Sequence, residues 1–220
     1  MGLGGKLEPL ELNGAQVFSG YLDAATQADL VAAVRSVVAQ APLFHPVTAS
    51  GQKMSVRMTS AGTLGWVSDK GGYRYQPAHP NGTPWPAIPD GILRVWRDVS
   101  GTPRDPDCCL VNYYDGSARM GLHQDRDEAE FDWPVVSISL GDDGLFRIAT
   151  PKGRSPSSSV WLRSGDVVVL SGAARMAYHG IDRIKPNTSP LLQNGGRLNL
   201  TLRVAGPTGG PSNSPRRSSA

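Results

Sequence analysis

The second half of this chain reads as one short strand after another, and this pattern restricts the fold more than any other feature of the sequence. Runs rich in valine, isoleucine, leucine and aromatic residues are separated by turn-forming segments such as Gly141-Asp-Asp-Gly144. The expected strands span residues 108–114, 120–123, 135–140, 145–148, 160–162, 166–170, 176–179 and 197–204. Many short strands at this spacing predict a sandwich, a barrel or a jelly roll.

The first half combines an edge strand at 15–18 and two helices with a less regular segment. Asp23 is a suitable N-cap for a helix that runs to about Gln40 with one apolar face. A second helix is expected over residues 90–99, packed beside the first on a sheet. Between them, residues 45–89 are rich in glycine, proline and aromatic residues, with a strand expected at 54–59 and a hairpin formed by 64–66 and 72–75. The fold class is therefore α+β, mainly β.

Length and composition fit one globular domain, which we expect over residues 15–206 of the 220. Residues 1–14 are expected to be a flexible N-terminal segment, and residues 207–220, rich in proline, glycine and serine, a disordered tail. The net charge of +3 favours anionic partners only mildly and is not a nucleic-acid signature by itself.

Cysteine usage and hydropathy indicate a cytoplasmic protein. Cys108 and Cys109 are neighbours in an expected strand, so they point to opposite faces and are poorly placed for a disulfide. Buried reduced thiols are the better interpretation. No apolar run reaches the roughly 18 residues of a membrane span, and the N-terminus lacks the apolar core of a signal peptide. We therefore expect no membrane contact.

Two histidines, one aspartate and two arginines form the candidate site. His123 and Asp125 are two residues apart, a spacing that places both side chains on one face of a strand, and His179 ends a separate apolar run. Two imidazoles and one carboxylate are the ligand set of a facial triad for Fe(II). Arg197 and Arg203 lie six residues apart on an alternating strand, so both face one side and can grip carboxylates.

Each part of this pattern also has an ordinary explanation. A histidine beside a carboxylate is more often a surface pair than a metal site, and a zinc hydrolase also uses such ligands, although it has no use for the paired arginines. In the 45–89 segment, Trp66, Tyr73 and Tyr75 alternate with basic residues such as Arg74. Such rings either stack nucleobases or simply cover the core. The full constellation favours the metal site and a lid above it.

The ordered motifs closely resemble those of the bacterial AlkB proteins. They are Leu64-Gly-Trp66, Gly72-Tyr73-Arg-Tyr75, Pro84-Trp-Pro-Ala87, Asn112-Tyr-Tyr114, Gly121-Leu-His123-Gln-Asp125-Arg-Asp127-Glu128, Ser137-Ile-Ser-Leu-Gly141, Gly165-Asp-Val-Val-Val169, Tyr178-His179-Gly180 and Arg197-Leu-Asn199-Leu-Thr-Leu-Arg203. The resemblance spans roughly residues 50–205. It implies a double-stranded β-helix (jelly-roll) core over 105–206 and a β-rich nucleotide-recognition lid over 45–89.

The resemblance also implies a role for each matching residue. It assigns the iron to His123, Asp125 and His179, and 2-oxoglutarate to Arg197 and Arg203 with Asn112, Tyr114 and Asn199 as further polar contacts. It assigns the substrate to Trp66, Tyr73, Arg74, Tyr75, Asp127 and Arg154, with the flipped base held between Trp66 and His179. One position departs from the family pattern: a gap-free alignment places Gly153 where the family has an arginine, and Arg154 follows one residue later.

The implied activity is the repair of alkylated nucleobases by an Fe(II)- and 2-oxoglutarate-dependent dioxygenase. With O2, the enzyme would hydroxylate an N-methyl group of 1-methyladenine or 3-methylcytosine, and formaldehyde, succinate and CO2 would be released. The expected partner is alkylated DNA, preferably single-stranded because flipping the base then costs least, with RNA as a further candidate. We expect a monomer. The alternatives are a related dioxygenase acting on tRNA bases and a non-catalytic module that binds single strands.

Overall fold

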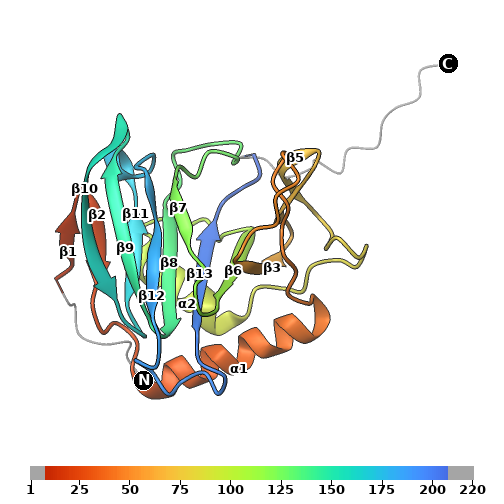
Figure 1. The fold of residues 1–220 in the computed structure, drawn as a ribbon, viewed down its shortest axis with the longest axis horizontal. Helices are drawn as coiled ribbons and strands as arrows, with labels where there is room; N and C mark the ends of the chain where they lie inside the picture. The colour runs from red at the N-terminus through yellow and green to blue at the C-terminus, as the bar shows by residue number, and fades with distance from the viewer. Residues whose placement is uncertain (1–7, 208–220) are drawn as a thin grey trace.

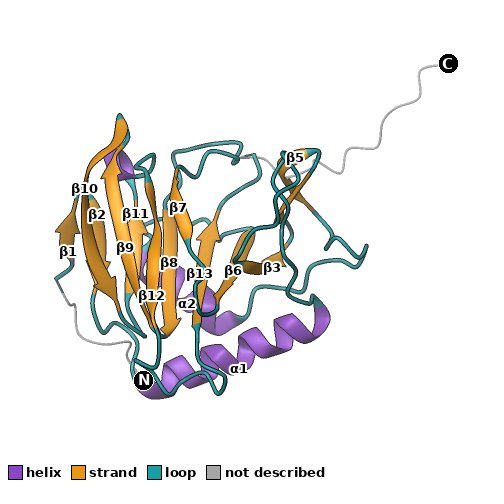
Figure 2. Cartoon of the chain, viewed as in Figure 1, coloured by secondary structure: helices purple, strands orange, loops and turns teal. Residues whose placement is uncertain are grey.

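The computed structural model describes residues 8–207. Two helices and thirteen strands fall in this range (Figure 1), and β structure dominates (Figure 2). The elements are β1 (Leu10–Leu12), β2 (Ala15–Phe18), α1 (Ala24–Gln40), β3 (Arg57–Gly62), β4 (Gly65–Asp69), β5 (Gly72–Gln76), α2 (Asp90–Val99), β6 (Cys108–Tyr114), β7 (Met120–His123), β8 (Val135–Gly141), β9 (Asp143–Thr150), β10 (Gly153–Leu162), β11 (Val167–Leu170), β12 (His179–Lys185) and β13 (Arg197–Arg203), with a 3-10 turn, η1 (Gly172–Ala174).

Two sheets face each other and form the jelly roll that the sequence predicts. The larger has the order β1-β2-β11-β8-β13-β6-β3, and the smaller has the order β10-β9-β12-β7. One apolar core lies between the larger sheet and the two helices, and a second lies between the sheets. The β4–β5 hairpin forms a separate two-stranded sheet at the β3 side of the molecule, far from β9 and β10 (Figure 1).

Both helices form as predicted and cover the outer face of the larger sheet. The Asp23 carboxylate accepts a hydrogen bond from the Thr26 backbone N–H at 2.8 Å, which caps α1. The buried residues of α1 recur with helical period, at Leu30, Val31, Val34 and Val37. The helices therefore seal one face of the sheet and leave the other face for the site.

Strand β13 lies inside the larger sheet, between β8 and β6, and has one apolar face and one polar face. Leu198, Leu200 and Leu202 belong to the core under the helices. Alternation places the polar residues Arg197, Asn199, Thr201 and Arg203 on the face towards the smaller sheet. The expectation that the two arginines share one side of a strand is confirmed.

The β4–β5 hairpin is attached firmly at its base. Its strands pair from Gly65↔Gln76 to Asp69↔Gly72, which leaves a two-residue turn as the sequence indicates. Val67 is buried in a small cluster with Ala41 and Trp85. The opposite face of the hairpin is free to cover the opening between the two sheets.

Two of the expected strands have clearly different bounds in the structure. The strand expected at 54–59 begins at Arg57, because pairing with β6 runs from Arg57↔Tyr113 to Gly62↔Cys108. The strand expected at 160–162 begins at Gly153, because its serine-rich first part pairs with β9 at the sheet edge, across a bulge. An exposed edge needs no apolar alternation, so the sequence pattern does not reveal this part.

The expected strand at 176–179 is wrong. Residues 176–178 belong to no strand, η1 (Gly172–Ala174) precedes them, and β12 begins only at His179. The cause is Arg175, which is buried and donates to the carbonyls of Trp133 and Asp125 at 2.8 Å each. These bonds pull the chain out of the sheet before the histidine.

The chain ends differ in part from the expectation. The segment expected to be flexible over 1–14 contains the paired strand β1, and its first seven residues lie outside the described range. Of the expected tail, only Pro207 is described. Cys108 and Cys109 are buried free thiols. Between residues 8 and 207, neither helix has the length and apolarity that crossing a membrane requires.

Candidate active site

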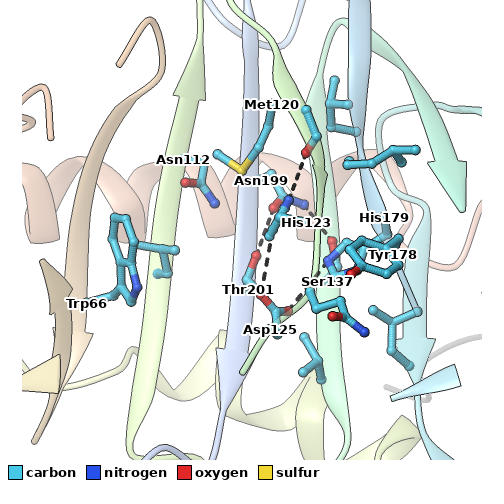
Figure 3. A pocket seen from close by; sticks show the side chains of 18 of the residues that line it. Trp66, Asn112, Met120, His123, Asp125, Ser137, Tyr178, His179, Asn199 and Thr201 are labelled. Carbon is cyan, nitrogen blue, oxygen red and sulfur yellow. Dashed lines mark hydrogen bonds and ion pairs between the residues drawn. The ribbon is translucent and has the colours of Figure 1, made fainter. Parts of the chain in front are cut away.

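A cavity of about 480 Å3 opens between the two sheets under the β4–β5 hairpin. Apolar side chains such as Leu110, Phe146 and Leu170 line it together with polar ones such as Asn112 and Asn199. Figure 3 shows His123, Asp125 and His179 converging on one region of this cavity, while Trp66 approaches from the side of the hairpin.

Strand pairing creates the histidine pair. His123 ends β7, His179 begins β12, and the two stand opposite each other in the ladder, with ring centroids 4.7 Å apart. The Nε2 atoms of His123 and His179 lie 3.7 and 3.5 Å from the two carboxylate oxygens of Asp125. Each of the three residues offers one ligand atom, and these atoms all lie within 4.8 Å of one another.

The protonation states suit metal binding. Burial lowers the pKa of His179 to about 4, against the attraction of Asp125, so this imidazole is neutral at pH 7. Burial alone would raise the pKa of Asp125, but the charge of Arg203, with that of Arg175, outweighs it and holds that pKa well below its usual range. The Nδ1 atoms of both histidines face the backbone carbonyls of Gly121 and Ala177 at 3.0 Å, which leaves Nε2 for a metal.

A buried, unsatisfied oxygen marks the place of a cation. Oδ2 of Asp125 accepts no hydrogen bond from the described residues, although Oδ1 accepts one from Arg203 at 2.7 Å. A buried carboxylate oxygen without a donor is costly unless a cation completes it. The triad, its neutral imidazole and this free oxygen fit Fe(II) held by two histidines and one carboxylate.

Gly180 allows the two histidine strands to approach, and this gives a first prediction. A Cβ atom at Gly180 would lie 2.5 Å from the carbonyl oxygen of Met120 and 2.7 Å from that of Gly121. Gly180→Ala should therefore push β7 away from β12, separate His123 from His179, and weaken Mn(II) binding by about tenfold or more in a calorimetric titration.

The matched control is Gly121→Ala on the opposite strand, where an added Cβ meets nothing within 4 Å. Equal metal affinity in the two variants would show that strand spacing does not set the metal geometry.

Arg203 is the centre of a buried charge network. Its Nη2 bonds Asp125, its Nε lies 3.4 Å from Glu128, and its Nη1 donates to the Tyr75 hydroxyl at 3.1 Å. The Tyr75 hydroxyl donates in turn to Glu128 at 2.8 Å. Burial would lower the pKa of Arg203, but the nearby carboxylates and Tyr75 hold it well above its usual value. Arg203 is therefore a permanent cation beside the triad.

Arg197 is also buried, but its hydrogen-bond partners are a hydroxyl and backbone carbonyls and not carboxylates. It is 0% exposed, and its Nη2 donates to the Ser139 hydroxyl at 2.7 Å. Its Nη1 lies 3.4 Å from the carbonyls of Asp142 and Leu162, and Leu162 lines the cavity. Burial lowers its pKa to about 10, so it remains charged at neutral pH. No carboxylate of the described residues pairs with it, so its charge is unpaired, and Arg197 lies behind the cavity wall and does not itself line the cavity.

Polar groups connect the regions of the two arginines. Asn112, Tyr114 and Asn199 all line the cavity, as does Thr201, which donates to Asn199 at 2.9 Å. The amide oxygen of Asn112 is buried without a hydrogen-bond partner among the described residues. This wall and the two arginines suit a small dicarboxylate.

Four of the six predicted substrate residues surround the cavity. Trp66, Tyr73, Asp127 and Arg154 all line it. Trp66 stacks on Tyr73 with centroids 5.5 Å apart and donates from Nε1 to Asp127 at 3.0 Å. Arg154 lies over the Tyr178 ring at 5.3 Å.

The other two point elsewhere. Arg74 is exposed and ion-paired with Asp69 at 2.7 Å within the hairpin. Tyr75 directs its hydroxyl to Arg203 and Glu128 and does not line the cavity. Alternation explains the difference for Arg74, which lies between Tyr73 and Tyr75 and so faces the other side. The structure thus does not place Arg74 or Tyr75 where a base would lie.

Two buried ionic residues were not predicted to be functional. Glu128 and Arg175 pair at 3.3 Å with side chains 1% and 3% exposed, and Arg175 also holds the backbone carbonyl of Asp125. They fix the loop that carries the metal carboxylate. The sequence signal for Arg175 is only its position four residues before His179, and sequence spacing does not show which residues Arg175 contacts.

The jelly roll, the triad and the arginine pair define the class of 2-oxoglutarate-dependent iron oxygenases. Residues 14–203 match the family described as the 2OG-Fe(II) oxygenase superfamily. A Caulobacter vibrioides "Alpha-ketoglutarate-dependent dioxygenase AlkB homolog" is 51% identical over 193 residues, 87% of this chain and 88% of that one. The Escherichia coli K12 "Alpha-ketoglutarate-dependent dioxygenase AlkB" is 38% identical, covering 90% and 93%.

A solved structure entitled "The structure of OsALKBH1" superposes with a TM-score of 0.74 at 30% identity, over 90% of this chain and 98% of that chain. The chain belongs to the 2OG-Fe(II) oxygenase superfamily and, within it, to the AlkB family. The predictions of the jelly-roll fold, the enzyme class and the requirement for Fe(II), 2-oxoglutarate and O2 are confirmed.

Proposed function

We propose that this protein removes N-alkyl groups from nucleobases in DNA by oxidation. One observation carries the proposal. Trp66 and Asp127 both line the cavity that contains the triad, and the Trp66 indole N–H donates a hydrogen bond to the Asp127 carboxylate. A methylated adenine or cytosine with a positive charge offers a flat ring to the indole and a cation to the acid. Both requirements are met at one place.

The reaction assigns a task to each part of the site. His123, Asp125 and His179 hold iron, which together with O2 and 2-oxoglutarate supplies the oxidising chemistry when bound. One oxygen atom of O2 enters succinate as CO2 leaves, and the other enters the methyl group, which then departs as formaldehyde. Arg197 and Arg203 hold the two carboxylates of 2-oxoglutarate, and Asn112, Tyr114 and Asn199 fix its orientation.

Trp66, whose other face is covered by Tyr73, stacks on the flipped base opposite His179, and Arg154 at the rim of the cavity neutralises a phosphate or orients the base edge. Because flipping costs less from an unpaired strand, we propose that single-stranded DNA is preferred and RNA is accepted. The protein acts as a monomer in the cytoplasm. The buried free thiols of Cys108 and Cys109 are compatible with a reducing compartment.

Asp127 provides a test of the charge argument. Asp127→Asn keeps an oxygen for the Trp66 hydrogen bond but removes the negative charge. We expect kcat/KM for 1-methyladenine to fall by about tenfold, and the preference over a neutral methylated base to fall with it, since an exposed charge pair contributes on the order of 1 kcal/mol. The comparison is made by mass spectrometry of the treated oligonucleotides.

Asp132→Asn removes the same charge from an exposed position of the same loop outside the cavity, and should change neither value. Equal losses in the two variants would mean that net charge, and not a contact with the base, sets the preference.

The substrate class is tested by product stoichiometry. Single-stranded DNA, duplex DNA and RNA, each with one 1-methyladenine or 3-methylcytosine, are incubated with Fe(II), 2-oxoglutarate and O2. We expect formaldehyde and succinate in equal amounts, with the highest rate on single-stranded DNA. Turnover on RNA alone would transfer the function to RNA bases. Succinate without formaldehyde on every strand would retain the dioxygenase but refute the demethylase.

A further inference from the structure

The loop over residues 186–196 joins β12 to β13 and therefore determines where Arg197 enters the site. Arg197 is the first residue of β13, directly after this loop. Its surroundings are tight, because a Cβ atom at Gly144 would lie 2.8 Å from the Arg197 Nε. A small displacement of the loop end would thus move the guanidinium.

Asp142, between β8 and β9, fastens this loop at both ends. One carboxylate oxygen accepts from the backbone N–H groups of Thr188 and Ser189 at 2.9 and 3.2 Å, and the other accepts from Gly196 at 2.9 Å. The Asp142 backbone N–H also donates to the Gly196 carbonyl at 2.8 Å. The side chain is buried, so these bonds do not compete with water.

Asp142 contacts Arg197 through its backbone and not through its carboxylate. Its backbone carbonyl accepts from Arg197 Nη1 at 3.4 Å, whereas its carboxylate is occupied by the loop. Had this acid turned to the arginine, the guanidinium charge would be neutralised. Instead the carboxylate is used by the loop, and the buried guanidinium keeps an unpaired charge.

We infer that Asp142 is a positioning residue for the cosubstrate site: it fixes the 186–196 loop so that Arg197 presents an unpaired charge to a carboxylate of 2-oxoglutarate. This inference rests on the proposed role of Arg197. The chain is organised differently around Arg203, which is fixed by direct ion pairs. The two arginines are therefore positioned in different ways, Arg203 by ion pairs and Arg197 by the loop that Asp142 holds.

The test measures binding without turnover, by titrating 2-oxoglutarate into the Mn(II)-loaded protein under anaerobic conditions. Asp142→Asn keeps one acceptor but places an amide N–H group against a backbone donor of the loop. We expect 2-oxoglutarate affinity to fall about tenfold with unchanged Mn(II) affinity, and in the Fe(II) enzyme a matching rise in KM for 2-oxoglutarate with kcat within about twofold.

Asp143→Asn is the matched control. It removes the neighbouring negative charge, which also acts on Arg197, but its side chain makes none of the loop bonds. Wild-type affinity in Asp143→Asn together with weakened binding in Asp142→Asn supports the inference. Equal weakening in both variants overturns it in favour of simple charge loss.

Two further variants complete the design. Arg197→Met tests the cosubstrate role itself: if it weakens 2-oxoglutarate binding while Asp142→Asn does not, only the positioning role is refuted. If Arg197→Met binds normally, the proposed role of Arg197 fails, and the inference fails with it.

Should Asp142→Asn not fold, Thr188→Val removes the hydroxyl that accepts from Asp143 N–H at 2.7 Å and keeps the acid. Weaker binding of 2-oxoglutarate supports the inference, and wild-type affinity overturns it.

Discussion

Replacing His123 with alanine should abolish demethylation and leave the fold intact. His123 is one of three ligands, so its loss removes a metal bond that the other two cannot replace, and we expect iron affinity to fall by more than about 100-fold. Its side chain is 37% exposed at the end of a short strand, which makes it the ligand whose removal disturbs packing least. The fold is checked by circular dichroism, and metal affinity by Mn(II) titration.

His45→Ala is the control, because His45 lies outside the cavity wall and its ring bonds the Met54 carbonyl at 2.8 Å. It should keep both metal binding and activity. Normal Mn(II) affinity in His123→Ala would place the metal elsewhere and remove the basis of the account.

The second large effect is a difference in protein stability between variants that lose one or the other buried arginine. Arg203→Met leaves the buried Asp125 carboxylate without its main cation and leaves Glu128 with Arg175 alone, and breaking such a network by removing one partner costs about 3–5 kcal/mol. Arg197 pairs with no carboxylate of the described residues, so Arg197→Met should leave the free energy of unfolding unchanged or raise it. Both variants should lose 2-oxoglutarate binding, by about 100-fold.

Urea unfolding of the metal-free proteins at pH 7 measures the difference. The pKa of Asp125 is lowered in the folded state, so its contribution to stability is present above its unfolded pKa of about 3.9 and is lost progressively as the pH falls from there through the lower folded value. Arg203→Met should weaken this pH dependence. Equal destabilisation by the two substitutions would contradict the assignment of Arg203 as the structural cation and Arg197 as the unpaired one.

Local patterns were enough to predict the central strand and the ligand set. The alternation of β13 assigns Arg197 and Arg203 to one face without any tertiary information. The spacing of His123 and Asp125 does the same for two ligands. Their meeting with His179 depends on the β7–β12 pairing, which no local pattern specifies; the chemistry of a complete ligand set and the resemblance to a family indicated it.

Contacts between distant segments explain the failures. Arg175 bonds the Asp125 carbonyl in a loop some fifty residues away, so the apolar run before His179 does not form the expected strand. The Tyr75 hydroxyl turns to a buried arginine, a partner that the hairpin sequence does not reveal. Arg154 reaches the cavity despite its shifted position because β10 contains a bulge between Gly153 and Ser157.

The most direct test of the account is mass spectrometry of a single-stranded DNA oligonucleotide with one 1-methyladenine, after aerobic incubation with the protein, Fe(II) and 2-oxoglutarate. We predict that the methyl group is lost, that the loss requires both Fe(II) and 2-oxoglutarate, and that it disappears in His123→Ala. An unchanged oligonucleotide, in a reaction where the protein binds Fe(II) and converts 2-oxoglutarate to succinate, would contradict oxidative demethylation as the function of this site.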